Sequence, residues 1–154
     1  MSSWLEKWNP EDEVFWEERG SYIAWRTLII TTSSLVLSFA TWFMVSAIVI
    51  LLPDVGFKFS QMQLFWLAAM PGLSGGTFRL IHTFLIPIYG TQKVVTTSVF
   101  IKLLPCIGIG LAVTNPHTTF WTFMALCFLS GFAGGDFSSH MPSTSMFFPK
   151  RLQG

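Results

Sequence analysis

The sequence predicts an all-α integral membrane protein with about four transmembrane helices. Two observations lead to this fold class. Only 11% of the 154 residues are charged while 51% are hydrophobic, whereas soluble domains typically carry about 25% charged residues. Four stretches also have the length needed to cross a bilayer, which is about 20 mostly apolar residues. The sixteen Phe and seven Trp residues suit a surface that faces lipid tails and headgroups.

The chain divides into an N-terminal segment and one membrane domain. Residues 1–26 hold six acidic and three basic residues, which favours a cytoplasmic or interfacial segment, or a partly ordered tail, over a cleavable signal peptide. Residues 27–154 form the membrane domain. No strand-like alternation appears in it, so helices must satisfy the backbone. The spans are expected at about residues 27–52, 62–89, 94–114 and 118–148.

The positions of Lys and Arg predict the orientation, because short cytoplasmic loops are enriched in both. With both ends inside, six flanking basic residues are cytoplasmic and only Lys58 is outside. We therefore expect a multi-pass protein of the inner (plasma) membrane with both ends in the cytoplasm. The net charge of +1 offers no broad basic surface to a nucleic acid. The expected partner is therefore the lipid bilayer and not a nucleic acid.

Three ionisable residues, Arg79, Lys102 and Asp136, fall inside the predicted spans. At the α-helical rise they lie about 14 to 18 Å from the cytoplasmic ends of their spans, near the middle of a core about 30 Å thick. Charges at this depth are costly and usually mark a transport pathway or an ion pair. Lys102 and Asp136 are on adjacent spans at similar depths, so we hypothesise a buried ion pair or a coupling role. Arg79 is the rival partner of Asp136.

Arg79 belongs to a polar stripe of small residues that is predicted to share one helix face. Its guanidinium stays charged when desolvated and offers five donors, so it suits a planar oxyanion. The alternative is an arginine held between helices by carbonyls or a carboxylate. The other members of the stripe are Gly72, Gly75, Gly76, His82 and Thr83.

Two further patterns concern helix shape and packing. Gly131, with the glycines that follow it, predicts a break or close packing in the fourth span, and Pro142 predicts a kink there. Ser34, Ser38 and Thr41 form a polar line on the first span. That line fits either a pathway lining or hydrogen bonds between helices.

The sequence shows no phosphate loop, paired-carboxylate cleft or metal-ligand spacing, so neither an enzyme nor a metal or other cofactor is expected. One alternative function is a haem-binding electron-transfer subunit. His82 and His140 lie on two parallel spans at similar depths, which makes bis-histidine ligation geometrically feasible. A small membrane scaffold that acts only by helix association is the third hypothesis.

Several motifs together resemble the nitrate/nitrite transporter branch of the major facilitator superfamily, over nearly the whole chain. They are Trp8–Trp16, Leu52–Phe59, Gln63–Gly75, Pro87–Gly90, Gly131–Phe137 and Phe147–Lys150.

This resemblance implies the first part of a twelve-helix carrier that works by alternating access. Nitrate or nitrite would lie between two arginines, of which Arg79 matches the first, while Phe137 matches an aromatic residue packed against the anion. The family pattern has Asn at Asp136, an apolar residue at Lys102 and Tyr at His82. These departures and the missing helices lead us to expect a truncated or split carrier or a decaying copy of one, inactive alone; a second chain that supplies the remaining helices is one possible partner.

Overall fold

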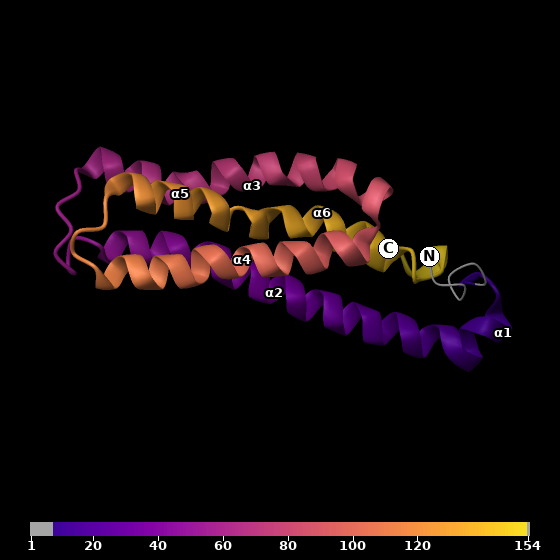
Figure 1. Cartoon of the computed structure of the whole chain (residues 1–154). Coiled ribbons are helices and arrows are strands. Elements are labelled where there is room, and N and C mark those ends of the chain that lie inside the picture. Colours follow the sequence, from indigo (N-terminus) through magenta and orange to yellow (C-terminus); the bar gives the residue numbers. More distant parts are fainter. Residues whose placement is uncertain (1–7, 154) are drawn as a thin grey trace.

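The computed structural model describes residues 8–153, which are largely helical and contain no strand. Figure 1 shows long helices packed side by side as a bundle, with α5 and α6 arranged end to end. This architecture confirms the all-α fold class. In chain order the elements are α1 (Glu13–Phe15), a π-helical turn (Trp16–Gly20), α2 (Ser21–Leu51), α3 (Gln61–Tyr89), α4 (Thr91–Thr114), α5 (Phe120–Ser130), α6 (Phe132–Ser145) and a 3-10 turn (Lys150–Leu152).

The first helical stretch begins at Glu13 and continues without interruption to Leu51, so it starts well before the span expected from residue 27. Asp12 starts it, because its carboxylate accepts from the backbone amides of Val14 (3.1 Å) and Phe15 (3.4 Å). Figure 1 shows this N-terminal part of α2 extending beyond the rest of the bundle. The interfacial segment expected from the sequence is therefore helical from Glu13 onward.

Local signals set the ends of α3 and the start of α4. Ser60 and Gln63 form a capping box at the start of α3. Gly90 ends α3 and begins α4 with a φ of +79°, a conformation that favours glycine. A single residue therefore reverses the chain between two long helices.

The fourth predicted span is divided at Gly131 into α5 and α6. A Cβ atom on Gly131 would lie 1.9 Å from Ser74 Oγ and 2.7 Å from the Gly75 backbone nitrogen of α3. Only glycine permits this approach between the two helices. Helix α6 continues through Pro142 to Ser145, so the interruption lies at the glycine rather than at the proline.

Helix α6 packs against α2, α3 and α4 and is the central element of the half of the bundle nearer the chain ends. At the opposite end, near the α2–α3 and α4–α5 loops, an apolar core includes Leu52, Leu67 and Phe123, each no more than 1% exposed. Figure 1 places the start of α1, the α3–α4 turn and the C-terminal turn together at the other end.

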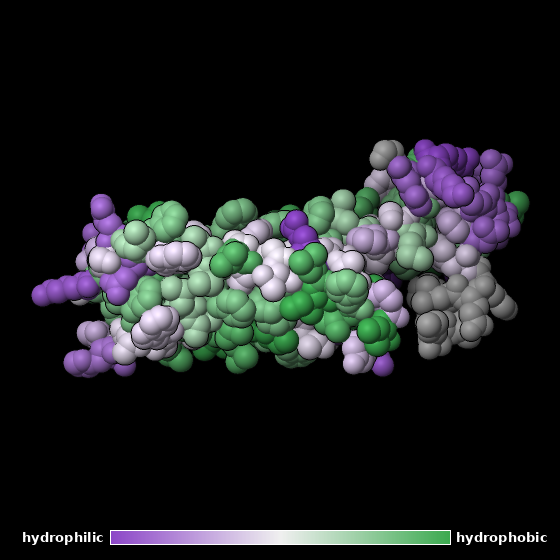
Figure 2. Space-filling model, turned by 90° about the horizontal axis from the view of Figure 1, so that it is seen from above, coloured by the Kyte–Doolittle hydropathy of each residue, from purple (hydrophilic) through white to green (hydrophobic). Residues whose placement is uncertain are grey.

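The surface is that of a membrane protein. Figure 2 shows a largely hydrophobic face along the middle of the molecule, with hydrophilic residues gathered at both ends. Within residues 8–153, three helical stretches are long and apolar enough to cross a membrane: Glu13–Leu51, Thr91–Thr114 and Phe120–Ser145. Helix α3 has sufficient length at 29 residues but is not among the three, because glycines and polar side chains dilute its apolar character.

Candidate functional site

A network of charged and hydroxyl side chains lies inside the bundle where α2, α4 and α6 meet. Lys102 of α4 and Asp136 of α6 form an ion pair, and Asp136 has no exposed surface. Ser38 of α2 donates to Oδ2 of Asp136 at 2.8 Å and accepts from Lys102 Nζ at 2.7 Å. Ser98 of α4 donates to Oδ1 of Asp136 at 2.5 Å. Each charge therefore has an opposite charge and at least one hydroxyl partner, which is the arrangement that a buried ion pair needs.

Arg79 lies elsewhere, on an open face of α3. Its guanidinium carbon is 5.2 Å from the ring centroid of Phe137, a cation–π contact that joins α3 to α6. Phe137 in turn lies edge-on to Phe39 of α2, with ring centroids 6.4 Å apart. Both Arg79 and Phe137 are exposed on the surface of the bundle. The ion pairs among residues 8–153 are Lys102–Asp136 and Arg151–Glu13, so Asp136 pairs with Lys102 and not with its rival.

The polar stripe around Arg79 is divided by the packing of α3 against α6. Gly75 and His82 are buried on one side, where a Cβ on Gly75 would lie 3.1 Å from the Trp42 ring. Gly72 and Gly76 are exposed, and a Cβ on either would meet nothing within 4 Å. The single face expected from the sequence is therefore half packing surface and half open surface, and Arg79 is on the open half.

The two histidines of the haem hypothesis both have partners within the helix packing. His82 Nδ1 lies 3.4 Å from Ser139 Oγ and faces Gly135, where an added Cβ would be only 2.8 Å away. His140 Nδ1 donates to the carbonyl of Asp136 at 2.8 Å. These contacts use one nitrogen of each ring, between α3 and α6 for His82 and within α6 for His140, and give no support to haem ligation.

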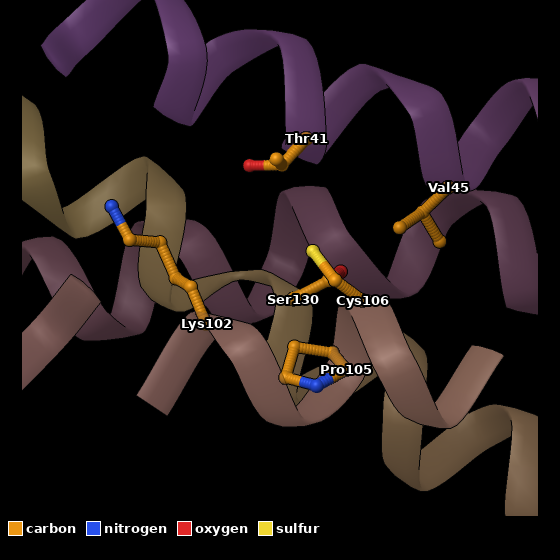
Figure 3. Close-up of a pocket in the computed structure, with 6 residues that line it drawn as sticks. All are labelled: Thr41, Val45, Lys102, Pro105, Cys106 and Ser130. Atoms are coloured by element: carbon orange, nitrogen blue, oxygen red, sulfur yellow. The ribbon is translucent and has the colours of Figure 1, made fainter. Parts of the chain in front are cut away.

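Two cavities lie beside the Lys102 network. One of about 10 Å³ is lined by residues of α2, α4 and α5, among them Thr41, Cys106 and Ser130, and Figure 3 shows these side chains and Lys102 around it. A cavity of this size holds at most one water molecule. The second, about 190 Å³, is an open groove between α2 and α4. Arg79 lines neither cavity, so the ion-pair network and the arginine are separate polar centres.

The comparisons with known proteins cover almost the whole chain. No protein-family model matches it. It is 57% identical over 152 residues, 99% of its length, to the probable nitrate/nitrite antiporter NarK2 of Thermus thermophilus. It is 43% identical over 150 residues, 97% of its length, to the nitrate/nitrite transporter NarU of Escherichia coli (strain K12). The chain is homologous to the nitrate/nitrite transporters. These transporters are members of the major facilitator superfamily, and the chain spans about a third of their length, 34% and 32% respectively.

Within this nitrate/nitrite transporter homologue, sequence reasoning missed one member of the buried network. Ser98 lies one turn before Lys102, so the two side chains share a face of the helix. This spacing could have indicated from the sequence that Ser98 lies near the ion pair. The sequence indicates Ser38 only as part of a polar line on α2. Its contact with Asp136, 98 residues away in the chain, depends on how the helices are arranged in space.

Proposed function

We propose that this chain forms part of a nitrate/nitrite carrier and that Arg79 and Phe137 are its contribution to the anion site. The observation that carries the proposal is the position of the Arg79 guanidinium over the Phe137 ring, on a face of the bundle that no described helix covers. The homology to nitrate/nitrite transporters supplies the substrate class. The activity is transport of an anion across the bilayer, with no bond made or broken.

The chemistry of these side chains suits a small planar oxyanion. A guanidinium is planar, remains charged when it loses water, and can donate two parallel hydrogen bonds to two oxygens of one anion. The ring of Phe137 provides an apolar wall beside that charge. Asp136, the residue before Phe137, would repel an anion if its charge were unbalanced, but its carboxylate is paired with Lys102. Arg79 is then left to attract the anion.

Further helices must cover the open face. An arginine near the bilayer centre costs about 2.5–3.5 kcal/mol on insertion scales, and Arg79 lies near the middle of α3 with its side chain exposed. Other helices, in a second chain or in a continuation of this one, would enclose the anion and supply the opposite half of its site. Alternating access would then expose the site to each side in turn. Residues 1–154 alone are not expected to transport nitrate in liposomes.

The proposed location is the inner (plasma) membrane, with both ends cytoplasmic. Figure 1 places the start of α1, the α3–α4 turn and the C-terminal turn at one end of the bundle. Basic residues gather at that end, and the loop after α2 at the opposite end carries Lys58. The excess of basic residues marks the cytoplasmic side. Those at the first end are Arg19, Arg26, Lys93, Lys150 and Arg151.

The test is nitrate uptake by a hybrid that joins residues 1–154 to the remaining helices of a working nitrate/nitrite transporter. Arg79→Ala should abolish uptake, and Arg79→Lys should also fail because lysine keeps the charge but loses the planar fork. Arg26→Lys is the matched control, since Arg26 lies near the end of the bundle and its change should leave uptake intact. Uptake that is insensitive to Arg79→Ala would refute the assignment.

A further inference from the structure

Two neighbouring side-chain contacts join α2 and α6 at Asp136 and Phe137. Ser38 and Phe39 are consecutive on α2, and Asp136 and Phe137 are consecutive on α6. Ser38 donates to Asp136 at 2.8 Å inside the bundle, while Phe39 meets Phe137 at the surface. The buried Ser38–Asp136 bond therefore lies directly beside the Phe39–Phe137 contact, and Arg79 stacks on the Phe137 ring.

We propose that the Lys102–Asp136–Ser38–Ser98 network positions Phe137, and through it Arg79, for anion binding. Consecutive residues on an α-helix point about 100° apart, so holding the Asp136 side chain in one direction fixes the direction of Phe137. Asp136 is held from two helices, by Ser38 of α2 and by Ser98 and Lys102 of α4. Its three partners resist rotation and sliding of α6.

Glycine packing on the other side of α6 strengthens this argument. Gly134 and Gly135 bring α6 against α3, where added Cβ atoms would lie 3.1 Å from Gly75 Cα and 2.8 Å from His82 Nδ1. Glycines allow this close approach but donate no side-chain bond that would fix the rotation of α6. The α3–α6 surface adds one long polar contact, His82 Nδ1 to Ser139 Oγ at 3.4 Å, so the shorter bonds to Asp136 supply most of the directional contacts at this level of α6. This inference rests on the proposed anion site, but its first test needs no anion.

The first test measures the α2–α6 alignment in the full chain by cysteine cross-linking in detergent. With Cys106 and Cys127 replaced by Ala, Phe39→Cys and Phe137→Cys should cross-link through a short bifunctional reagent. Ser98→Ala removes one bond to the carboxylate and should lower the yield at least about threefold. The control pair is Ser46→Cys with Ala68→Cys, which joins α2 to α3 where Ser46 Oγ lies 3.4 Å from the Ala68 carbonyl. Its yield should not change.

Lys102→Leu should lower the yield of the 39–137 cross-link further. The double variant Lys102→Leu with Asp136→Asn should recover most of that yield, because no uncompensated charge remains. If Lys102→Leu abolishes both the 39–137 and the 46–68 cross-links, the bundle has unfolded in that variant. The yield of the 39–137 cross-link in Ser98→Ala then decides whether the network positions α6. A 39–137 cross-link that stays at the parent yield in Ser98→Ala would overturn the proposal.

The second test uses the nitrate uptake of the hybrid. Ser98→Ala should raise the KM for nitrate about threefold or more while the amount of hybrid in the membrane stays the same. Ser130→Ala is the control, because the Ser130 hydroxyl donates within its own helix to the Cys127 carbonyl at 2.7 Å. An unchanged KM in Ser98→Ala also counts against positioning. A hybrid that never transports refutes the carrier function, whereas the cross-links report on the alignment independently.

Discussion

Lys102 and Asp136 form an ion pair between α4 and α6, and both also bond to the hydroxyl of Ser38 on α2. Three helices thus meet at one carboxylate. Removing one member of such a pair leaves the other charge buried and unpaired, whereas removing both leaves only apolar or amide groups. The energetic consequences can be measured in the isolated chain.

Lys102→Leu and Asp136→Asn are each expected to destabilise the protein by about 3–5 kcal/mol, and the double variant should recover most of that loss. The measurement is a double-mutant cycle on unfolding in detergent. If the two losses simply add, the pair contributes nothing as a pair.

Gly131→Ala should destabilise the bundle by about 1–3 kcal/mol, because its new Cβ would overlap Ser74 Oγ and approach the Gly75 backbone. Gly76→Ala is the matched control on α3, where the added Cβ meets nothing. It should be neutral or stabilising by about 0.5–1 kcal/mol, since alanine favours helix over glycine. Thermal unfolding of both variants in detergent compares them. Equal stability of the two would contradict the tight α3–α6 contact.

Thiol labelling in intact cells tests the orientation. In a background with both native cysteines replaced by Ala, Val55→Cys, in the exposed loop after α2, should react with an impermeant reagent. Gln153→Cys should react only after the membrane is opened. Ser3, another position suited to this test, lies outside the described residues. Protection of Val55→Cys together with labelling of Gln153→Cys would reverse the topology.

The histidine variants distinguish packing from haem ligation. His140→Ala removes the 2.8 Å bond to the Asp136 carbonyl and should lower stability by about 0.5–1.5 kcal/mol. Neither His140→Ala nor His82→Ala should change the visible spectrum of the purified protein. A stoichiometric Soret band that disappears in either variant would establish the electron-transfer alternative.

The general fold could be predicted from the sequence because long apolar runs admit few structures in a membrane. The early start of the first helix was missed although Asp12 followed by Glu13 is a readable cap signal. The contacts that hold this segment, such as that between Trp16 and Phe148 with rings 5.8 Å apart, depend on tertiary packing. Arg79 stood out because a charge at that depth is costly. Its contact with Phe137 is long-range, however, and Ser98 was missed because its spacing of one turn from Lys102 is a weak signal without the position of Asp136.

The one-residue turn at Gly90 also sets the relative depth of Arg79 and Lys102 along the bundle. Arg79 lies 11 residues before Gly90 and Lys102 lies 12 residues after it, so the rise of the two helices brings both Cα atoms to within about 2 Å of the same level. The two cations therefore lie at nearly the same level along the bundle. Deleting one residue from either helix between the turn and its charge would rotate that charge by about 100° and shift it by about 1.5 Å. This single reversal thus keeps the arginine and the lysine in register across the bilayer.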